Sequence, residues 1–169
     1  MAVVAGAEAG LNAIKKGATI VQLRAPDLTT RELEREANAL VPQASVPVLV
    51  SSRCDVALAA GAAGVNLPER DISVAEARTL LGQRLVGRSV HSIESALAAE
   101  RAGADYVIFG PVWPSPSHPD EKPQGARALA ELARALRIPV LAIGGVTSER
   151  VEECAKAGAA GYAAITLFK

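Results

Sequence analysis

The chain has 169 residues, of which 50% are hydrophobic and only 3% are aromatic. Its 18 basic and 18 acidic residues cancel, and no stretch carries mainly one sign, which argues against a nucleic-acid binder or a protein that binds anionic membranes. No apolar run reaches the roughly 18 residues of a membrane span, so we expect neither nucleic acid nor membrane as a partner.

The length is typical of one domain, which we expect to cover residues 1–169. The N-terminal stretch "MAVVAGAEAG" lacks the basic start and long apolar centre of a signal peptide. Cys54 and Cys154 lie far apart without metal-ligand spacing, which favours buried thiols in a reducing compartment over a disulfide. These features predict a cytoplasmic protein.

One pattern recurs along the chain: an Ala-rich helix, a turn with glycine, and a short β-branched strand. Glycine after a helical run suits the left-handed position that ends a helix. The pattern occurs as "KKGATIVQL" at 15–23, "AAGAAGVNL" at 59–67, "RAGADYVIF" at 101–109 and "KAGAAGYAAI" at 156–165.

In chain order, a short strand at 2–5 precedes a helix near 7–16. Thr29 with Glu32 and Ser73 with Glu76 match the S/T-x-x-E capping box that marks a helix start. Further strands are predicted near 19–23, 47–50, 64–67, 84–88, 105–109, 139–143 and 161–166. The helices that separate them are predicted near 29–41, 54–60, 73–81, 92–102, 125–136 and 147–157.

The strands are apolar throughout, as expected where helices cover both faces of an α/β sheet. Strict alternation with short loops predicts parallel strands and right-handed crossovers. Eight such units would close a (β/α)8 TIM barrel, minimal at both ends because the first strand is short and no eighth helix follows the last. An open doubly wound sheet is the alternative. Because the missing helix leaves apolar surface for a partner subunit to cover, we expect a homo-oligomer.

Polar groups follow the apolar strands at one end. In a TIM barrel the active site lies at the carboxyl ends of the strands, so this clustering indicates an enzyme. The residues delivered there are Gln22, Arg24, Ser51, Ser52, Arg53, Asn66, Asp71, Ser89, His91, Gly144, Gly145, Ile165 and Thr166.

Two loops are candidates for holding a phosphate. Gly144 and Gly145 in "AIGGVTSER" at 142–150 would let the backbone approach an anion near a helix start, although they would also suit a tight turn. The Pro-rich loop at 110–125 offers Ser115, Ser117 and His118. Long loops often bind ligands, but this loop is also compatible with a stiff lid that carries exposed polar residues.

His91, in "GRSVHS" at 87–92, is one of only two histidines. An imidazole at a strand end in a barrel mouth suits a general acid or base near neutral pH. The alternative is a partly exposed histidine that caps the helix at 92–102, although Ser92 can cap that helix alone.

Four stretches together resemble the thiamine phosphate synthase/TenI family of TIM barrels, in order over nearly the whole chain. The resemblance implies thiamin biosynthesis and a small-molecule carboxythiazole phosphate ligand. The stretches are "VQLRAP", "VSSRCDVALAAGAAGVNLPERD", "GRSVHSIESALAAERAGADYVIFGPVWPSPS" and "PVLAIGGVTSERVEECAKAGAAGYAAIT".

The chain departs from the synthases of that family at several positions. They carry lysine where Pro26 stands, and Asn-Asp-Arg where the chain has Ser51-Ser52-Arg53. Asp71 matches their other magnesium ligand, and His118 replaces a pyrophosphate-contacting lysine. Expelling pyrophosphate normally needs Mg²⁺ and cations. These departures disfavour the synthase reaction, and we expect no metal and no cofactor.

The TenI branch of the family matches better, at "VNLP" (65–68) and "SVHS" (89–92). The resemblance implies a thiazole tautomerase, an isomerase in which His91 exchanges the protons. Gly144, Gly145, Ile165 and Thr166 would hold the phosphate through backbone N–H groups, assisted by Ser115 and Ser117. Arg24 would face the carboxylate or phosphate. The alternatives are thiamine phosphate synthase and a non-catalytic thiazole-phosphate binder, such as a carrier or sensor.

Overall fold

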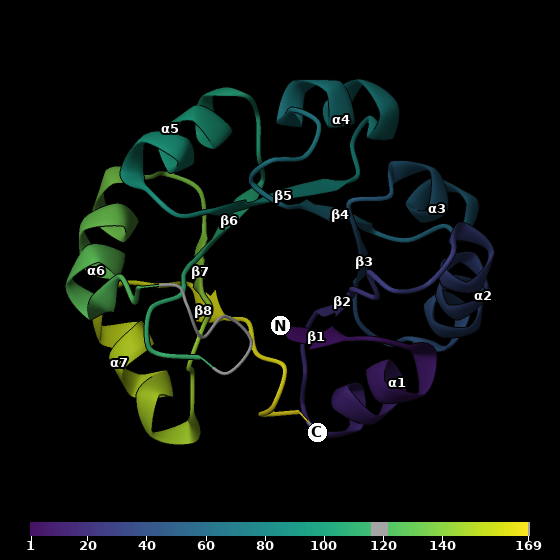
Figure 1. The fold of residues 1–169 in the computed structure, drawn as a ribbon, viewed down its shortest axis with the longest axis horizontal. Coiled ribbons are helices and arrows are strands. Elements are labelled where there is room, and N and C mark those ends of the chain that lie inside the picture. Colours follow the sequence, from purple (N-terminus) through teal and green to yellow (C-terminus); the bar gives the residue numbers. More distant parts are fainter. Residues whose placement is uncertain (116–121, 169) are drawn as a thin grey trace.

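The computed structural model describes residues 1–115 and 122–168, in which eight strands alternate with seven α-helices (Figure 1). The strands are β1 (Ala2–Val4), β2 (Val21–Leu23), β3 (Val48–Ser51), β4 (Gly64–Leu67), β5 (Leu85–Val90), β6 (Tyr106–Phe109), β7 (Val140–Ala142) and β8 (Gly161–Tyr162). The helices are α1 (Ala7–Lys15), α2 (Thr30–Leu40), α3 (Cys54–Ala59), α4 (Val74–Leu81), α5 (Ile93–Arg101), α6 (Gly125–Ala135) and α7 (Val151–Lys156), with 3₁₀ turns at Val41–Gln43 and Ser148–Arg150.

The strands pair in parallel in the order of the sequence, from β1 to β8. A bridge between Ala2 and Ala164 joins the two ends of the sheet, where the Val3 N–H donates to the Ala164 carbonyl at 2.9 Å. Figure 1 shows the helices arranged around the resulting ring. The predicted (β/α)8 barrel is confirmed, including its short first strand, and the open sheet is ruled out.

The predicted last strand at 161–166 is too long, because β8 itself spans only Gly161–Tyr162. After β8, the described C-terminal residues cross between α7 and α1 (Figure 1). Phe168 stacks on Tyr162, with ring centroids 6.3 Å apart, and packs against buried residues of α1 and its neighbouring strands. This segment covers part of the surface on which the expected self-association depends, and self-association stays a prediction.

Three helices begin as their sequences dictate. The hydroxyls of Thr29 and Ser73 each accept a backbone N–H three residues on, and the glutamates there return the bond. Ser92 caps α5 by accepting the Ser95 N–H at 3.1 Å. His91 is therefore not needed as a cap.

The core is built almost wholly from aliphatic side chains. One layer lies between the sheet and the helices, and a smaller cluster fills the barrel interior around Val3, Leu49, Tyr106 and Ile108. The Tyr106 ring fits there because Gly87 on the neighbouring strand has no side chain, since a Cβ at that position would lie 2.0 Å from the ring carbon Cζ.

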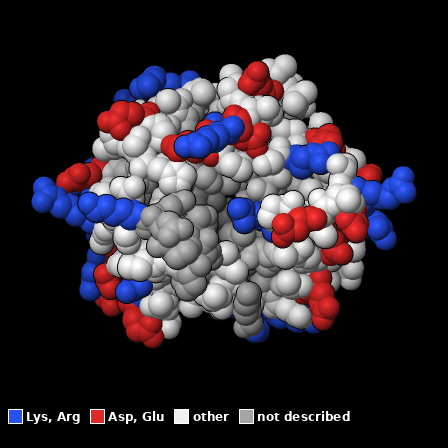
Figure 2. Space-filling view, in the orientation of Figure 1, with Lys and Arg blue, Asp and Glu red and all other residues white. Residues whose placement is uncertain are grey.

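The outer surface carries both signs of charge. Figure 2 shows acidic and basic side chains interspersed over one face, as the net charge of zero implies. Within the described residues, none of the helices has the length and apolar character that crossing a membrane requires.

Replacing Gly87 with alanine should destabilise the barrel, because the added methyl group would collide with the Tyr106 ring. Overpacking of this kind costs about 1–3 kcal/mol in free energy of unfolding, measurable by chemical denaturation. Gly161→Ala in β8 is the matched control, since its Cβ would meet only a Leu141 methyl group at 3.3 Å. Equal stability of the two variants would contradict this packing.

Candidate active site

A cavity of about 540 Å³ opens at the carboxyl ends of the strands. Its volume lies within the range of about 300–1,000 Å³ that is usual for small-molecule sites. Eleven of the predicted site residues line this cavity: Gln22, Arg24, Ser51, Asn66, Ser89, His91, Ser115, Gly144, Gly145, Ile165 and Thr166. The predicted residues Ser117 and His118 lie outside the described residues.

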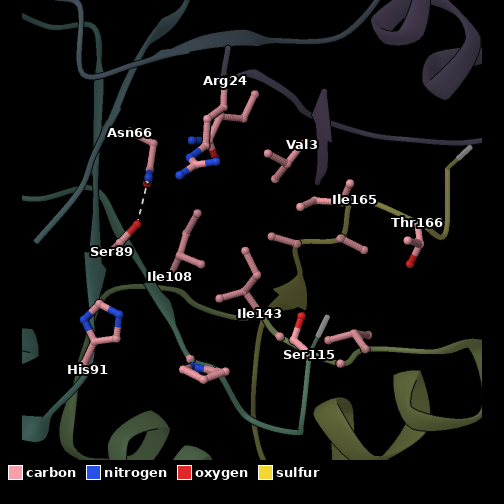
Figure 3. Close-up of a pocket in the computed structure, with 18 of the residues that line it drawn as sticks. Val3, Arg24, Asn66, Ser89, His91, Ile108, Ser115, Ile143, Ile165 and Thr166 are labelled. Atoms are coloured by element: carbon pink, nitrogen blue, oxygen red, sulfur yellow. Dashed lines mark hydrogen bonds between the residues drawn. The ribbon is translucent and has the colours of Figure 1, made fainter. Parts of the chain in front are cut away.

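Aliphatic side chains lie between two sides of the cavity that carry polar groups. In Figure 3, Asn66, Ser89 and His91 lie along one side, and Ile165 and Thr166 lie on the opposite side. Ile108 and Ile143 lie between them. A flat ring would contact these aliphatic side chains while its polar substituents reach the walls.

The lining of the cavity includes two buried carboxamides, Gln22 and Asn66, which are 3% and 2% exposed. The Asn66 Nδ2 donates to the Ser89 Oγ at 3.0 Å, whereas the buried Asn66 Oδ1 accepts no hydrogen bond from the described residues. Leaving a buried acceptor unpaired is costly. A ligand with a hydrogen-bond donor at this point would remove the cost.

His91 follows β5 and pairs with a carboxylate that sequence reasoning missed. Its Nδ1 lies 2.7 Å from the Glu69 Oε2, and its backbone N–H donates to Oε1 at 3.2 Å. Burial raises the pKa of Glu69, but hydrogen bonds from Ser95 and His91 outweigh burial and hold the pKa below its ordinary value. Glu69 is therefore ionised near neutral pH, and the pair combines a proton carrier with a fixed negative charge.

The Gly144-Gly145 turn follows β7, with φ angles of 90° and 64°. A Cβ on Gly144 would lie 2.6 Å from the Pro111 Cα, and one on Gly145 would lie 2.5 Å from the Pro114 carbonyl oxygen. The glycines thus serve a tight turn and close packing against the loop after β6. They also line the cavity, so the two interpretations of this motif are compatible.

Arg150 is a second residue that sequence reasoning passed over, although it ends the quoted "AIGGVTSER" segment. Its Nη1 donates to the Gly145 carbonyl at 2.7 Å, and its guanidinium lies 5.3 Å above the centre of the Trp113 ring. Arg150 and Thr147 both line the cavity. A cation therefore supports the turn expected to hold phosphate.

Three residues predicted at the strand ends, Ser52, Arg53 and Asp71, do not line the cavity. Arg53 instead binds Asp55 and Thr30 on the outside of the barrel. Ser52 adopts the left-handed conformation (φ 66°). Here the backbone leaves the direction of β3 and leads into α3, away from the site.

The magnesium ion implied by the synthases does not fit these residues. Asp71 uses one oxygen to accept the Ile72 N–H at 2.8 Å, and its other oxygen is buried without a partner among the described residues. The described part of the chain contains no group of three or more His, Cys, Asp or Glu side chains able to hold a metal ion. Hard cations need several oxygen ligands, and Ser52 removes the second carboxylate.

Comparison with known proteins identifies the family. The family model described as thiamine monophosphate synthase matches residues 5–168. The chain belongs to this family.

The chain is similar to named proteins of several organisms. The chain is 44% identical over 159 residues to the thiamine-phosphate synthase of Chlorobium luteolum, covering 91% of this chain and 75% of the relative. The corresponding protein of Chloroflexus aurantiacus is 40% identical over 158 residues, covering 91% and 73%. Among solved structures, thiamine phosphate pyrophosphorylase from Pyrococcus furiosus superimposes with a TM-score of 0.89 at 32% identity, over 98% of this chain and 83% of that one.

The donor set around Asp71 predicts weak metal binding. We expect calorimetry with inorganic pyrophosphate to give the same affinity with and without MgCl₂, because a single available carboxylate cannot replace the water ligands of Mg²⁺. Pyrophosphate binding that strengthens strongly on adding MgCl₂ would contradict this prediction and favour the synthase reaction.

Proposed function

We propose that the chain is a thiazole tautomerase, which moves a proton to convert the dearomatised carboxythiazole phosphate into its aromatic isomer. The observation that carries the proposal is the His91–Glu69 pair at the wall of the cavity. The reaction is an isomerisation, so the chemistry required is a positioned proton carrier and a means of holding the substrate.

In the proposed reaction His91 transfers the protons, and other residues of the cavity bind the substrate. His91 takes a proton from one position of the dearomatised ring system and returns a proton at another, so that the double bonds rearrange into the aromatic thiazole. No group leaves and no oxidant is needed. Its side chain is 45% exposed, which allows the imidazole to exchange protons with water.

The phosphate would lie at the turn formed by Gly144 and Gly145, beside Ile165 and Thr166. Ser115 also lines the cavity and offers a hydroxyl group. Arg150 and Arg24 supply positive charge facing the cavity, matching an anionic ligand. Ser117 keeps its predicted assisting role.

A second candidate is thiamine phosphate synthase. The relatives described above carry that name, so the comparisons favour the synthase over the tautomerase. The residues argue the other way, because Pro26 and Ser52 stand where the synthases carry a cation and a metal ligand. Both reactions would use the same cavity, and the aromatic product of the tautomerase would be the thiazole substrate of the synthase.

Substituting His91→Asn should lower the rate of aromatisation by about 10²–10⁴-fold, the usual contribution of general acid–base catalysis. Asparagine retains hydrogen bonding but does not exchange protons near neutral pH. Ultraviolet absorbance follows the aromatic product directly. An unchanged rate in a folded variant would exclude His91 as the proton carrier and make His118 the next residue to test.

Gly144→Val should instead weaken binding of the aromatic product, measured by calorimetry. The branched side chain meets Pro111 and opposes the positive φ, displacing the turn that faces the phosphate. Product affinity should barely change in His91→Asn, which leaves that turn intact. Tight product binding by a chain without aromatisation or coupling activity would indicate a carrier or sensor.

A further inference from the structure

Glu69 engages His91 with both carboxylate oxygens, one on the backbone N–H and one on the ring Nδ1. An ionised carboxylate can only accept hydrogen bonds, so the ring proton of neutral His91 must lie on Nδ1. The other nitrogen, Nε2, then carries a lone pair. The contact therefore selects one tautomer and one ring orientation.

The backbone that carries the Glu69 carboxylate is held in place from the neighbouring strand. Arg88 of β5 donates from Nη2 to the backbone carbonyl of Glu69 and from Nη1 to that of Ile72, both at 2.6 Å. Leu67, the last residue of β4, pairs in register with Arg88. The segment that carries Glu69 is thus tied to the strand that ends next to His91.

We infer that Glu69 is the positioning residue for His91: its carboxylate fixes the Nδ1–H tautomer and leaves Nε2 as the atom that exchanges protons with the ligand. The effect of Glu69 on catalysis rests on the proposed tautomerase function. The tautomer and its dependence on Glu69 are properties of the protein alone. Glu69 acts through His91, and its effect should fall on turnover and leave phosphate binding unchanged.

The protonation of each ring nitrogen can be read by long-range ¹H–¹⁵N NMR of the ligand-free chain at a pH where the imidazole is neutral. The chain has two histidines, so comparison with His91→Asn assigns the signals. We expect His91 to carry its proton on Nδ1, the opposite of the tautomer that a free histidine side chain prefers in water. In Glu69→Gln the proton should move toward Nε2, because the amide group can donate to Nδ1.

The same variants separate positioning from binding in the aromatisation assay. For Glu69→Gln we expect kcat to fall by about 10²-fold with KM within about twofold, since the wrong tautomer impairs catalysis and the phosphate contacts remain. Glu69→Asp keeps a carboxylate one methylene shorter and should recover part of kcat and of the Nδ1–H signal.

Glu131→Gln is the matched control. Glu131 lines a small pocket on another side of His91 and binds Arg127 of its own helix at 3.0 Å. Removing this nearby negative charge should change neither the tautomer nor kcat.

A native His91 ring protonated on Nε2 would overturn the inference. So would an unchanged tautomer and unchanged kcat in folded Glu69→Gln, or in Glu69→Asp and Glu69→Ala if the glutamine variant does not fold. If NMR shows the expected tautomers but the native chain does not aromatise the substrate, the positioning role is supported and the tautomerase function is contradicted.

Discussion

The parallel hydrogen bonds that join β1 to the residues after β8 determine whether this site exists at all. The Val3 N–H bonds to the Ala164 carbonyl at 2.9 Å, and the Ala164 N–H bonds to that of Met1 at 3.1 Å. Closure brings Ile165 and Thr166 to the rim that carries Gln22 and Arg24. Without it these residues would lie at opposite edges of an open sheet.

Once the ring is closed, its register decides which side chains meet. Leu67 pairs with Arg88 across β4 and β5, so the residues that follow the two strands emerge side by side. Glu69 and His91 meet there, while Gly144 follows β7 on another part of the rim. The part of the rim with His91 can therefore transfer protons, and the part with Gly144 can bind the ligand. This division matches a reaction in which binding and proton transfer involve different parts of one small molecule.

The sequence predicted the barrel because its signals were local. The capping boxes at Thr29 and Ser73 set helix starts, glycines ended helices, and apolar runs identified the strands. The strand-end rule then placed Asn66, Ser89 and His91 in one cavity. Glu69 was not predicted as a site residue, because nothing in "NLPERD" shows which charged side chain turns toward the neighbouring strand. The contact of Gly144 with Pro111 was equally hidden, since it joins two loops that are distant in sequence.

The residues and the comparisons point to different reactions for this cavity. Pro26 and Ser52 remove groups that help pyrophosphate leave, whereas the relatives are named as synthases. The proton-transfer account depends on the His91–Glu69 pair acting without a metal ion. In this proposal the chemistry lies at one strand end of the barrel, and the turn of Gly144 and Gly145 would hold the phosphate.

The most direct test compares two reactions in one preparation of the unmodified chain. One assay follows aromatisation of the dearomatised thiazole phosphate, and the other follows coupling of thiazole phosphate to the pyrimidine pyrophosphate with MgCl₂. The account predicts aromatisation well above the rate in buffer, with coupling absent. Magnesium-dependent coupling without faster aromatisation would contradict it.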